Sequence, residues 1–177
     1  MSITVDVRYP IGRFQWAGSN TPTDRRRMIA NLESIPDRFA RAVEGLGPEQ
    51  LNTPYREDGW TIKQVVHHVA DSHMQMLGRV KMALTETNPT IKPYNEARWA
   101  ELADSQETPV EVSLALLKAL HTRFTILLRS LKEEDWAKKF NHPERGPMTL
   151  DMVLAMYNWH GEHHLAHING AKQQHGW

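Results

Sequence analysis

Apolar residues recur every three or four positions along four long stretches of the chain, which is the spacing of one buried face of an α-helix. The last stretch, residues 150–167, carries a single stripe formed by Leu150, Val153, Tyr157, His160, His164 and His167. Thr149 stands just before it, where an N-cap residue belongs. The pattern predicts a long helix whose buried face passes from aliphatic side chains to histidines.

The first stretch begins at Thr21-Pro22, which suits an N-cap followed by a first helical residue. Its apolar stripe contains Met28, Leu32, Ile35, Phe39, Val43 and Leu46. Pro36 lies inside the stripe, so we expect it to kink or interrupt this helix. The glycines and the proline of residues 45–48 should end it.

Two capping boxes predict where the remaining helices start. In the first, Thr61 is the N-cap and Gln64 answers three residues later, and the apolar pattern continues to about Glu86. In the second, Thr108 and Glu111 flank a proline at the first helical position. The helix that follows carries a seam in which histidine is the only polar member, namely Val110, Leu114, Leu117, His121, Phe124, Leu128 and Leu131.

The segments outside these stretches lack a helical period of comparable length. Residues 1–20 mix aromatic residues, proline and glycine, so we expect an irregular arm that packs on the domain. Residues 92–102 suit a loop with a short helix, and residues 141–147 suit a loop. The four long helices therefore predict an all-α, antiparallel four-helix bundle that forms one domain over residues 1–177.

Composition narrows the classes of function. The 177 residues include 21 Lys plus Arg and 21 Asp plus Glu, so no basic excess marks a surface for nucleic acid or an anionic membrane. The N-terminus has no apolar core of a signal peptide, and no stretch approaches the roughly 18 apolar residues of a membrane span. We expect a cytoplasmic protein with neither partner. Because cysteine is absent, histidine and carboxylate are the strong metal ligands available.

His160 and His164 lie one helical turn apart and within roughly 40° of each other around the helix. Two imidazoles that project side by side in this way can share one metal ion. A zincin helix has a general-base glutamate beside the first ligand, but this chain has Gly161 there. His163 lies at the edge of the stripe and is a weaker ligand candidate. Glu162 lies nearly opposite and should be solvated.

A third ligand should come from a facing helix, because bundles commonly build metal sites between helices. His67 and His68 are adjacent on the second predicted helix and separated by about 100° around it. His68 shares a flank with Thr61 and Ser72, so it is better placed than His67 to reach a neighbour. A lone histidine in an apolar seam, such as His121, is more often a hydrogen-bonded core residue or a support for a ligand than a ligand.

Three histidines would leave one coordination position open, which is typical of catalytic rather than structural zinc. Zinc is the expected ion, and nickel also suits imidazole ligands. The chain contains no nucleophile-elbow motif, Walker loop or dinucleotide-binding glycine motif. Serine hydrolysis and nucleotide-dependent chemistry therefore have no support in the sequence.

Several of these residues form motifs that resemble the DinB/YfiT superfamily, and most closely its YfiT branch. On the second predicted helix the motif is Trp60-Thr61-x-x-Gln64-Val65-Val66-x-His68, and on the last it is Trp159-His160-x-x-x-His164 with His167-Ile168. The similarity extends over nearly the whole chain through Tyr9-Pro10-Ile11-Gly12, Thr53-Pro54-Tyr55-Arg56, Ile91-Lys92-Pro93-Tyr94 and the terminal Gly176-Trp177.

The resemblance implies a four-helix bundle, a homodimer, and a divalent metal ion (zinc or nickel) held by His68, His160 and His164. It also implies a metal-dependent hydrolase that acts on a small molecule. Related members of the superfamily are S-transferases for low-molecular-weight thiols such as bacillithiol, which gives a second expectation for this chain.

Three hypotheses about function follow from these observations. A metal-dependent hydrolase would turn over substrates without added thiol, because the metal lowers the pKa of a bound water. A thiol S-transferase would need the thiol, which would attack an electrophile as the thiolate. The third is a non-enzymatic metal- or ligand-binding bundle, which the lack of a clear general base favours. Asp71 and Glu144 are the candidate bases.

Overall fold

The computed structural model describes residues 6–177, so the first five residues of the predicted arm lie outside the described part. Four long helices dominate it, namely α1 (Pro22–Val43), α3 (Ile62–Thr85), α6 (Val110–Arg129) and α7 (Leu150–His175). The connections contain the short helices α2 (Pro48–Leu51), α4 (Glu96–Trp99) and α5 (Ala103–Glu107), the 3₁₀ helix η1 (Glu133–Ala137), and the strands β1 (Lys139–His142) and β2 (Gly146–Thr149). The predicted four-helix bundle is confirmed.

Three of the predicted helix starts are confirmed by their hydrogen bonds. Thr21 and Thr149 each accept a backbone N–H through the side-chain oxygen. Thr61 Oγ1 accepts from the backbone N–H of Gln64 at 3.1 Å, and Gln64 Oε1 accepts from the backbone N–H of Thr61 at 2.9 Å. These bonds satisfy N–H groups that an uncapped helix would leave without partners.

The capping box predicted at Thr108 is wrong. Pro109 is the N-cap of α6, with an extended backbone (φ −60°, ψ 141°) and no side-chain cap. The Thr108 carbonyl instead accepts a hydrogen bond from Nε2 of His67 at 3.1 Å. The residue therefore joins α3 to the start of α6 and does not cap the helix.

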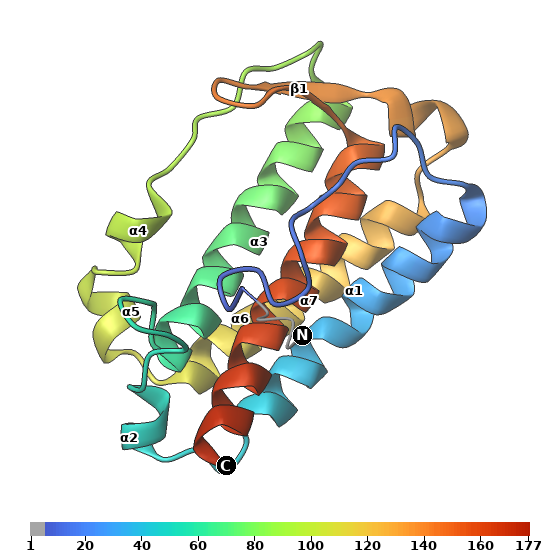
Figure 1. Ribbon diagram of the computed structural model, residues 1–177. Helices are drawn as coiled ribbons and strands as arrows, with labels where there is room; N and C mark the ends of the chain where they lie inside the picture. The colour runs from blue at the N-terminus through green and yellow to red at the C-terminus, as the bar shows by residue number, and fades with distance from the viewer. Residues whose placement is uncertain (1–5) are drawn as a thin grey trace.

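The four long helices form a ring in which α1 contacts α6 and α7, and α3 also contacts α6 and α7 (Figure 1). The side-chain pairs give the directions of the neighbours. His67 contacts Ser113 and His73 contacts His121, so α3 and α6 run parallel. α1 and α7 are also parallel, whereas α3/α7 and α1/α6 are antiparallel. The bundle is thus two parallel pairs packed in opposite directions. The predicted antiparallel arrangement holds for α3/α7 and α1/α6, whereas the other two neighbouring pairs are parallel.

Because of this arrangement, the connections lead from each long helix to a parallel or a diagonal helix, and not to an antiparallel neighbour. Residues 86–109, with α4 and α5, return the chain from the end of α3 to the beginning of its parallel neighbour α6 (Figure 1). Residues 44–61 and 130–149 join helices that are diagonal in the ring. Apolar periodicity identifies helices but says nothing of these crossovers, so the parallel pairs could not be predicted from it.

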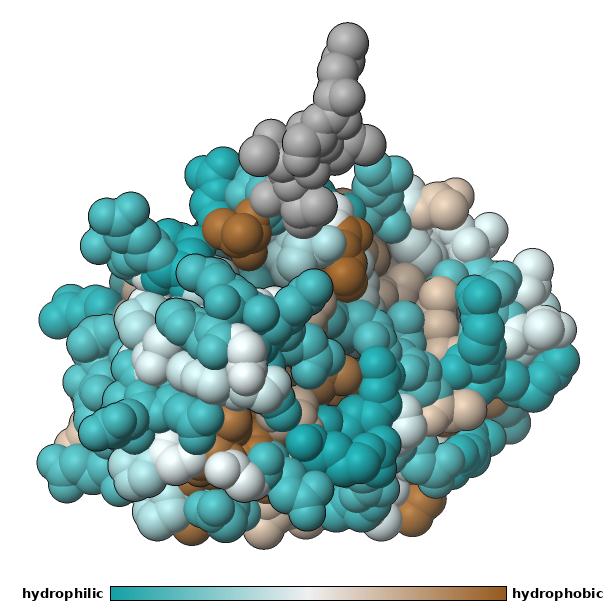
Figure 2. All heavy atoms as spheres, turned by 60° about the horizontal axis from the view of Figure 1, so that its bottom comes forward, coloured by the Kyte–Doolittle hydropathy of each residue, from teal (hydrophilic) through white to brown (hydrophobic). Residues whose placement is uncertain are grey.

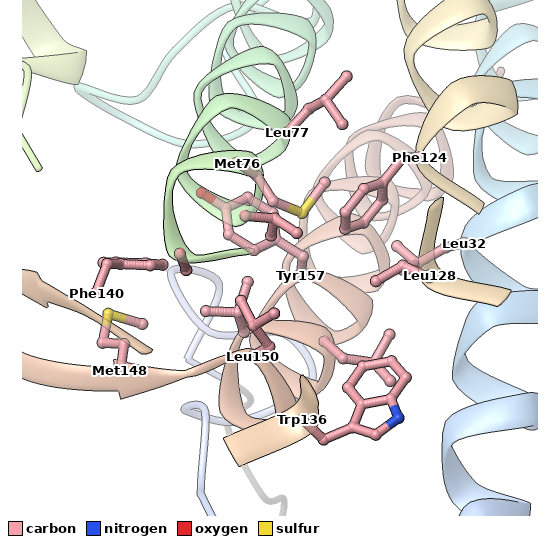
Figure 3. Close-up of a cluster of buried hydrophobic side chains, with 14 of the residues drawn as sticks. Leu32, Met76, Leu77, Phe124, Leu128, Trp136, Phe140, Met148, Leu150 and Tyr157 are labelled. Atoms are coloured by element: carbon pink, nitrogen blue, oxygen red, sulfur yellow. The ribbon is translucent and has the colours of Figure 1, made fainter. Parts of the chain in front are cut away.

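Residues 139–149 form an antiparallel hairpin, where the sequence suggested only a loop over residues 141–147. Phe140 pairs with Met148, and both side chains are buried beside Leu150 and Tyr157 (Figure 3). Gly146 has a φ angle of +75°, a backbone conformation that residues with a Cβ atom rarely adopt. The hairpin closes one end of the bundle. Each strand has only four residues, so its alternation of buried and exposed positions was too short to predict a strand from the sequence.

Pro36 does not interrupt α1, which runs as one helix from residue 22 to residue 43. It does remove one hydrogen bond, because proline has no N–H to donate to the carbonyl four residues earlier. That carbonyl belongs to Leu32, and it accepts a hydrogen bond from Nδ1 of His121 in α6. The carbonyl that Pro36 leaves without a donor in α1 is thus hydrogen-bonded by a side chain of the neighbouring helix α6.

Gly161 lies where α7 packs tightly against Ile35 of α1. A Cβ atom at this position would lie 2.9 Å from Cδ1 of the fully buried Ile35. Glycine is therefore required by helix packing, and a catalytic glutamate would not fit here.

The described part of the predicted arm, residues 6–20, has no regular secondary structure and lies along α7 (Figure 1). Nε1 of Trp159 donates to the Gly12 carbonyl at 3.3 Å, and Asn20 Nδ2 donates to the Asp151 carbonyl at 2.9 Å. The aromatic ring of Phe14 also packs near Trp159. These contacts agree with the expectation of an irregular arm that packs on the domain.

In residues 6–177, none of the helices combines the length and apolar character that crossing a membrane requires. The face of the molecule shown in Figure 2 is mostly hydrophilic, and its apolar side chains form small separate patches.

A buried ion pair fixes the end of the bundle near the hairpin. Asp151 accepts from Nε of Arg25 at 2.7 Å and from the backbone N–H of Asn20 at 2.8 Å. Burial alone would raise the pKa of Asp151, but the hydrogen bonds from Arg25 and Asn20 lower it overall. The pair should therefore stabilise the fold above the unfolded carboxyl pKa of about 4 and lose this contribution as the pH falls through the lower folded pKa.

We expect Asp151→Asn to lower the free energy of unfolding at pH 7 by about 3 kcal/mol, the lower end of the range for a broken buried ion pair. Arg25 keeps its bonds to Glu133, which limits the loss. Urea denaturation at pH 7 and pH 3 measures the effect, and the difference from the wild type should narrow at pH 3. Asp37→Asn, which removes an exposed pair with Lys118, should change stability by less than about 0.5 kcal/mol. Equal losses in the two variants would contradict the prediction.

Candidate metal centre

His68 of α3 and His160 and His164 of α7 come together between the antiparallel helices. Each offers one ring nitrogen, and these three atoms lie within 4.8 Å of one another. His68 and His164 are buried, and His160 is half-buried. The structure thus brings together all three residues that the sequence singled out as ligands.

The spacing of the nitrogens suits one small metal ion. Nε2 of His68 lies 3.3 Å from Nε2 of His160. Two nitrogen ligands at 2.0–2.1 Å from a tetrahedral zinc ion would be separated by about 3.3 Å. The third nitrogen needs only a small side-chain adjustment to complete such a set, so the donor atoms fit a divalent ion that prefers imidazole.

Burial keeps these imidazoles neutral. It lowers the pKa of His68 to about 4, with a smaller effect from the neighbouring histidines. Burial, followed by the surrounding histidines, also lowers the pKa values of His160 and His164 well below the usual 6.5. All three rings therefore carry a free lone pair at pH 7, which metal binding requires.

Further histidines continue from His160 into the core. His73 of α3 is fully buried, and its Nε2 lies 3.2 Å from Nδ1 of His160. Nδ1 of His73 lies 2.7 Å from Nε2 of His121 in α6, and the two rings stack. Nδ1 of His121 in turn donates to the Leu32 carbonyl of α1. We refer to His160, His73, His121 and the Leu32 carbonyl as the histidine chain.

The Leu32 carbonyl, at the end of the histidine chain, fixes the position of every proton in that chain. A carbonyl oxygen only accepts, so Nδ1 of His121 carries the proton and Nε2 of that ring must accept. It follows that Nδ1 of His73 donates to His121, and that Nδ1 of His160 donates to His73. Since a neutral ring holds one proton, Nε2 of His160 keeps its lone pair. The histidine chain therefore prepares this nitrogen to bind a metal ion.

His164 has a shorter support of the same kind. Its Nδ1 lies 3.4 Å from Nδ1 of His167, whose Nε2 lies 3.4 Å from the Arg8 carbonyl in the N-terminal arm. The same reasoning places a proton on Nε2 of His167 and on Nδ1 of His164, leaving Nε2 of His164 free to bind. Both contacts are long, so this support is weaker than the histidine chain.

His73 was not among the residues that the sequence indicated as part of the site. A signal was present, because His73 continues the apolar stripe of α3 at three or four residues from Val69, Met76 and Leu77, all of which are buried. The two apolar core clusters lie on either side of this level of the bundle, one around Leu32 and Phe124 and the other around Phe39 and Leu117. His73 and its partners are thus a polar layer between two apolar ones.

The other candidates occupy separate positions. His67 faces α6, where its Nδ1 lies 2.7 Å from Ser113 Oγ. His163 stacks on Trp159 at a centroid distance of 4.4 Å and does not belong to the three-nitrogen group. The expectation that Glu162 is solvated is wrong, because its carboxylate is half-buried and forms an ion pair with Arg38 of α1. The parallel packing of α1 beside α7 provides this partner.

The three histidines face a cavity of about 300 Å³ that lies between α3 and α7 and is covered by the hairpin and residues 93–96. Its wall combines aromatic, apolar and charged side chains, including Trp60, Ser72, Arg79, Tyr94, Glu96, His142, Glu144, Arg145, Tyr157 and Trp159. A cavity of this size is at the lower end of the range for small-molecule sites.

Neither candidate base lies beside the metal ligands in a buried position. Glu144 lines the cavity, but it is exposed. Asp71 is half-buried, and its pKa is raised to about 6 by burial and then by the neighbouring Asp104 carboxylate. Within the part of the chain that the structure describes, Asp71 is not in the cavity wall.

Comparison with known proteins places these features in a family. The family model of the DinB superfamily matches residues 31–168. A protein of Bacillus mycoides strain KBAB4, named "Putative metal-dependent hydrolase", is 50% identical over 97% of this chain and 99% of its own. A Bacillus cereus protein of the same name is 49% identical over the same shares.

Two solved structures are similar to this chain and share its four-helix bundle fold. YfiT from Bacillus subtilis, described as a probable metal-dependent hydrolase with an unusual four-helix bundle topology, is 44% identical. It superimposes with a TM-score of 0.96 over 98% of this chain and 99% of YfiT. The four-helix bundle protein TT2238 is 21% identical, with a TM-score of 0.57 over 80% of this chain and 94% of its own, and supports the fold alone.

Proposed function

This chain belongs to the DinB superfamily, and from that premise we propose that it is a metal-dependent hydrolase whose ion is bound by His68, His160 and His164. The observation that carries the proposal is the convergence of three neutral imidazole nitrogens at the wall of a small-molecule cavity. Zinc is the ion that we propose, with nickel as the alternative.

When bound at three imidazoles with an open position, such an ion polarises a carbonyl and lowers the pKa of a coordinated water. The residues of this chain orient the metal ligands and restrict the volume of the cavity in front of them. The histidine chain holds the His160 ring through a bond to His73. Trp60, whose ring centre lies 4.5 Å from that of His68, packs on the ligand and covers one side of the cavity. These contacts hold the ligands in place before the substrate arrives.

We expect the zinc- or nickel-loaded protein to hydrolyse activated esters or amides without added thiol, with one ion per chain. Elemental analysis of protein purified without a histidine tag, followed by assays of a panel of electrophiles with and without small thiols, tests both statements. Turnover that appears only with the thiol would favour the S-transferase. No turnover in either condition with the site fully loaded would favour a non-enzymatic binding bundle. Metal well below one equivalent, with no uptake of added zinc or nickel, would contradict the metal centre itself.

The remaining features of the proposal have two sources. The homodimer and the small-molecule substrate come from the family resemblance, and the cytoplasmic location without nucleic-acid or membrane partners comes from the composition. We propose a cytoplasmic homodimer that acts on a small molecule and has no nucleic-acid or membrane partner. Light scattering of the purified protein tests the dimer, and a monomer would leave the metal centre of the single chain unaffected.

A further inference from the structure

Arg79 is a buried cation in the wall of the cavity that contains the metal ligands. Its side chain lies on α3 and is only 9% exposed. His68, Ser72 and Arg79 are separated by four and seven residues, so they share one face of the helix, and all three line the cavity. Three turns, or about 16 Å of helix rise, separate His68 from Arg79. The Arg79 side chain therefore leaves α3 about three turns from the metal ligand on that helix.

This guanidinium has few partners in the protein. Its Nε is buried without a hydrogen-bond acceptor, and its Nη2 makes one long contact of 3.4 Å with the Lys92 carbonyl. No carboxylate of residues 6–177 forms an ion pair with it, and residues 1–5 contain no Asp or Glu. Glu96 and Glu144 line the same cavity but are exposed.

Arg25 shows what a buried arginine usually requires. It is 8% exposed, close to the value for Arg79, and its guanidinium bonds to the carboxylates of Asp151 and Glu133. Buried charges are rare unless they are paired, because removing an ion from water is costly. Arg79 lacks that pairing, yet its side chain lines a cavity with room for a small molecule. The missing partner is thus expected to come with the substrate.

We propose that Arg79 binds an oxyanion of the substrate, a carboxylate or a phosphate, while the group to be hydrolysed lies at the metal centre. This inference rests on the proposed function. The substrate would be a small acid with its anionic group at one part of the cavity and its reacting bond at another. Arginine suits this task because its planar fork of N–H donors matches the geometry of both oxyanions.

The test measures the binding of simple probes to the zinc-loaded full-length protein by tryptophan fluorescence, since Trp60 and Trp159 line the cavity. The probes are butyrate and methyl phosphate as anions and butyramide as the neutral counterpart of butyrate. We expect at least one anion to bind about 10- to 100-fold more tightly than butyramide, the range that one or two charge-assisted hydrogen bonds provide. The anion that is preferred identifies the substrate class.

Arg79→Gln should abolish this preference, and Arg79→Lys, which keeps the charge but not the fork, should retain part of it. Arg129→Gln is the matched control, because this exposed guanidinium already pairs with Glu33. It should bind the probes like the wild type. If Arg79→Gln fails to fold by circular dichroism, Arg79→Lys decides, with a preference lowered at least about threefold in support and an unchanged one against.

A metal ion also attracts anions, so His160→Ala is measured in parallel. An anion preference that survives Arg79→Gln but disappears in His160→Ala would belong to the metal and overturn the proposal, as would the absence of any preference in the wild type. Full zinc content in Arg79→Gln together with lost anion binding would support it. Binding that depends on Arg79 in a protein that hydrolyses nothing would contradict the proposed function and leave the anion site intact.

Discussion

His68→Ala is expected to lower the affinity for zinc by at least about 100-fold, because it removes one of the three nitrogen donors of the site. Losing only an outer partner of a ligand typically costs 10- to 100-fold, and losing the ligand should cost at least as much. Competition with a chromophoric chelator measures the affinity directly. His160→Ala and His164→Ala should behave in the same way.

The adjacent His67→Ala is the matched control. Its ring is buried like that of His68, but it bonds to Ser113 and to the Thr108 carbonyl, away from the metal centre. This variant should lose stability and keep its zinc affinity within about threefold, since the hydrogen bonds of the His67 ring go to Ser113 and Thr108 and not to a metal ligand. If His67→Ala lost the ion and His68→Ala retained it, the assignment of ligands on α3 would be wrong.

His73→Phe is expected to lower zinc affinity by about 10- to 100-fold, although His73 is not itself a ligand. Phenylalanine approximates the volume of the imidazole but can neither accept from Nδ1 of His160 nor donate to Nε2 of His121. The His160 ring then loses the contact that sets its orientation and tautomer. The same chelator competition, combined with urea denaturation, separates lost affinity from lost stability.

His67→Phe provides the comparison for this experiment, because it also replaces a buried histidine of α3 by a ring without nitrogen atoms. Both variants should be less stable than the wild type, since each leaves polar partners unsatisfied. Only His73→Phe should lose metal affinity, and His73→Gln, which can both donate and accept, should recover part of it. Equal zinc affinities in His73→Phe and His67→Phe would mean that the histidine chain is structural only.

The sequence predicted most of the features that depend on local spacing, although the cap at Thr108 was an exception. The capping residues Thr21, Thr61 and Thr149 act within three residues of the chain, and each was placed correctly. The choice of His68 over His67 rested on a rotation of about 100° per residue, which a regular helix preserves, together with the family resemblance. The structure accordingly brings His68 to the cluster and turns His67 towards α6.

Features that depend on which helices become neighbours could not be predicted in the same way. The ion pair of Glu162 requires α1 to lie parallel to α7, with Arg38 at the same level along the bundle as Glu162. The role of His73 requires α6 to run parallel to α3, so that His121 meets it. Both pairings result from the long connections between helices, whose sequences carry no periodic pattern. The stripe on a helix thus identifies the buried face but not its partner.

The proline in the middle of α1 also couples the metal centre to the folding reaction. Because Pro36 cannot donate a hydrogen bond, the regular hydrogen-bond pattern of α1 leaves the Leu32 carbonyl without a donor, and this acceptor remains available to His121 as long as α1 and α6 are docked. In the unfolded chain the same histidines interconvert freely between their two neutral tautomers. A single tautomer at His160 therefore appears only when all four long helices have assembled, so tertiary folding and maturation of the ligand set should occur as one cooperative event.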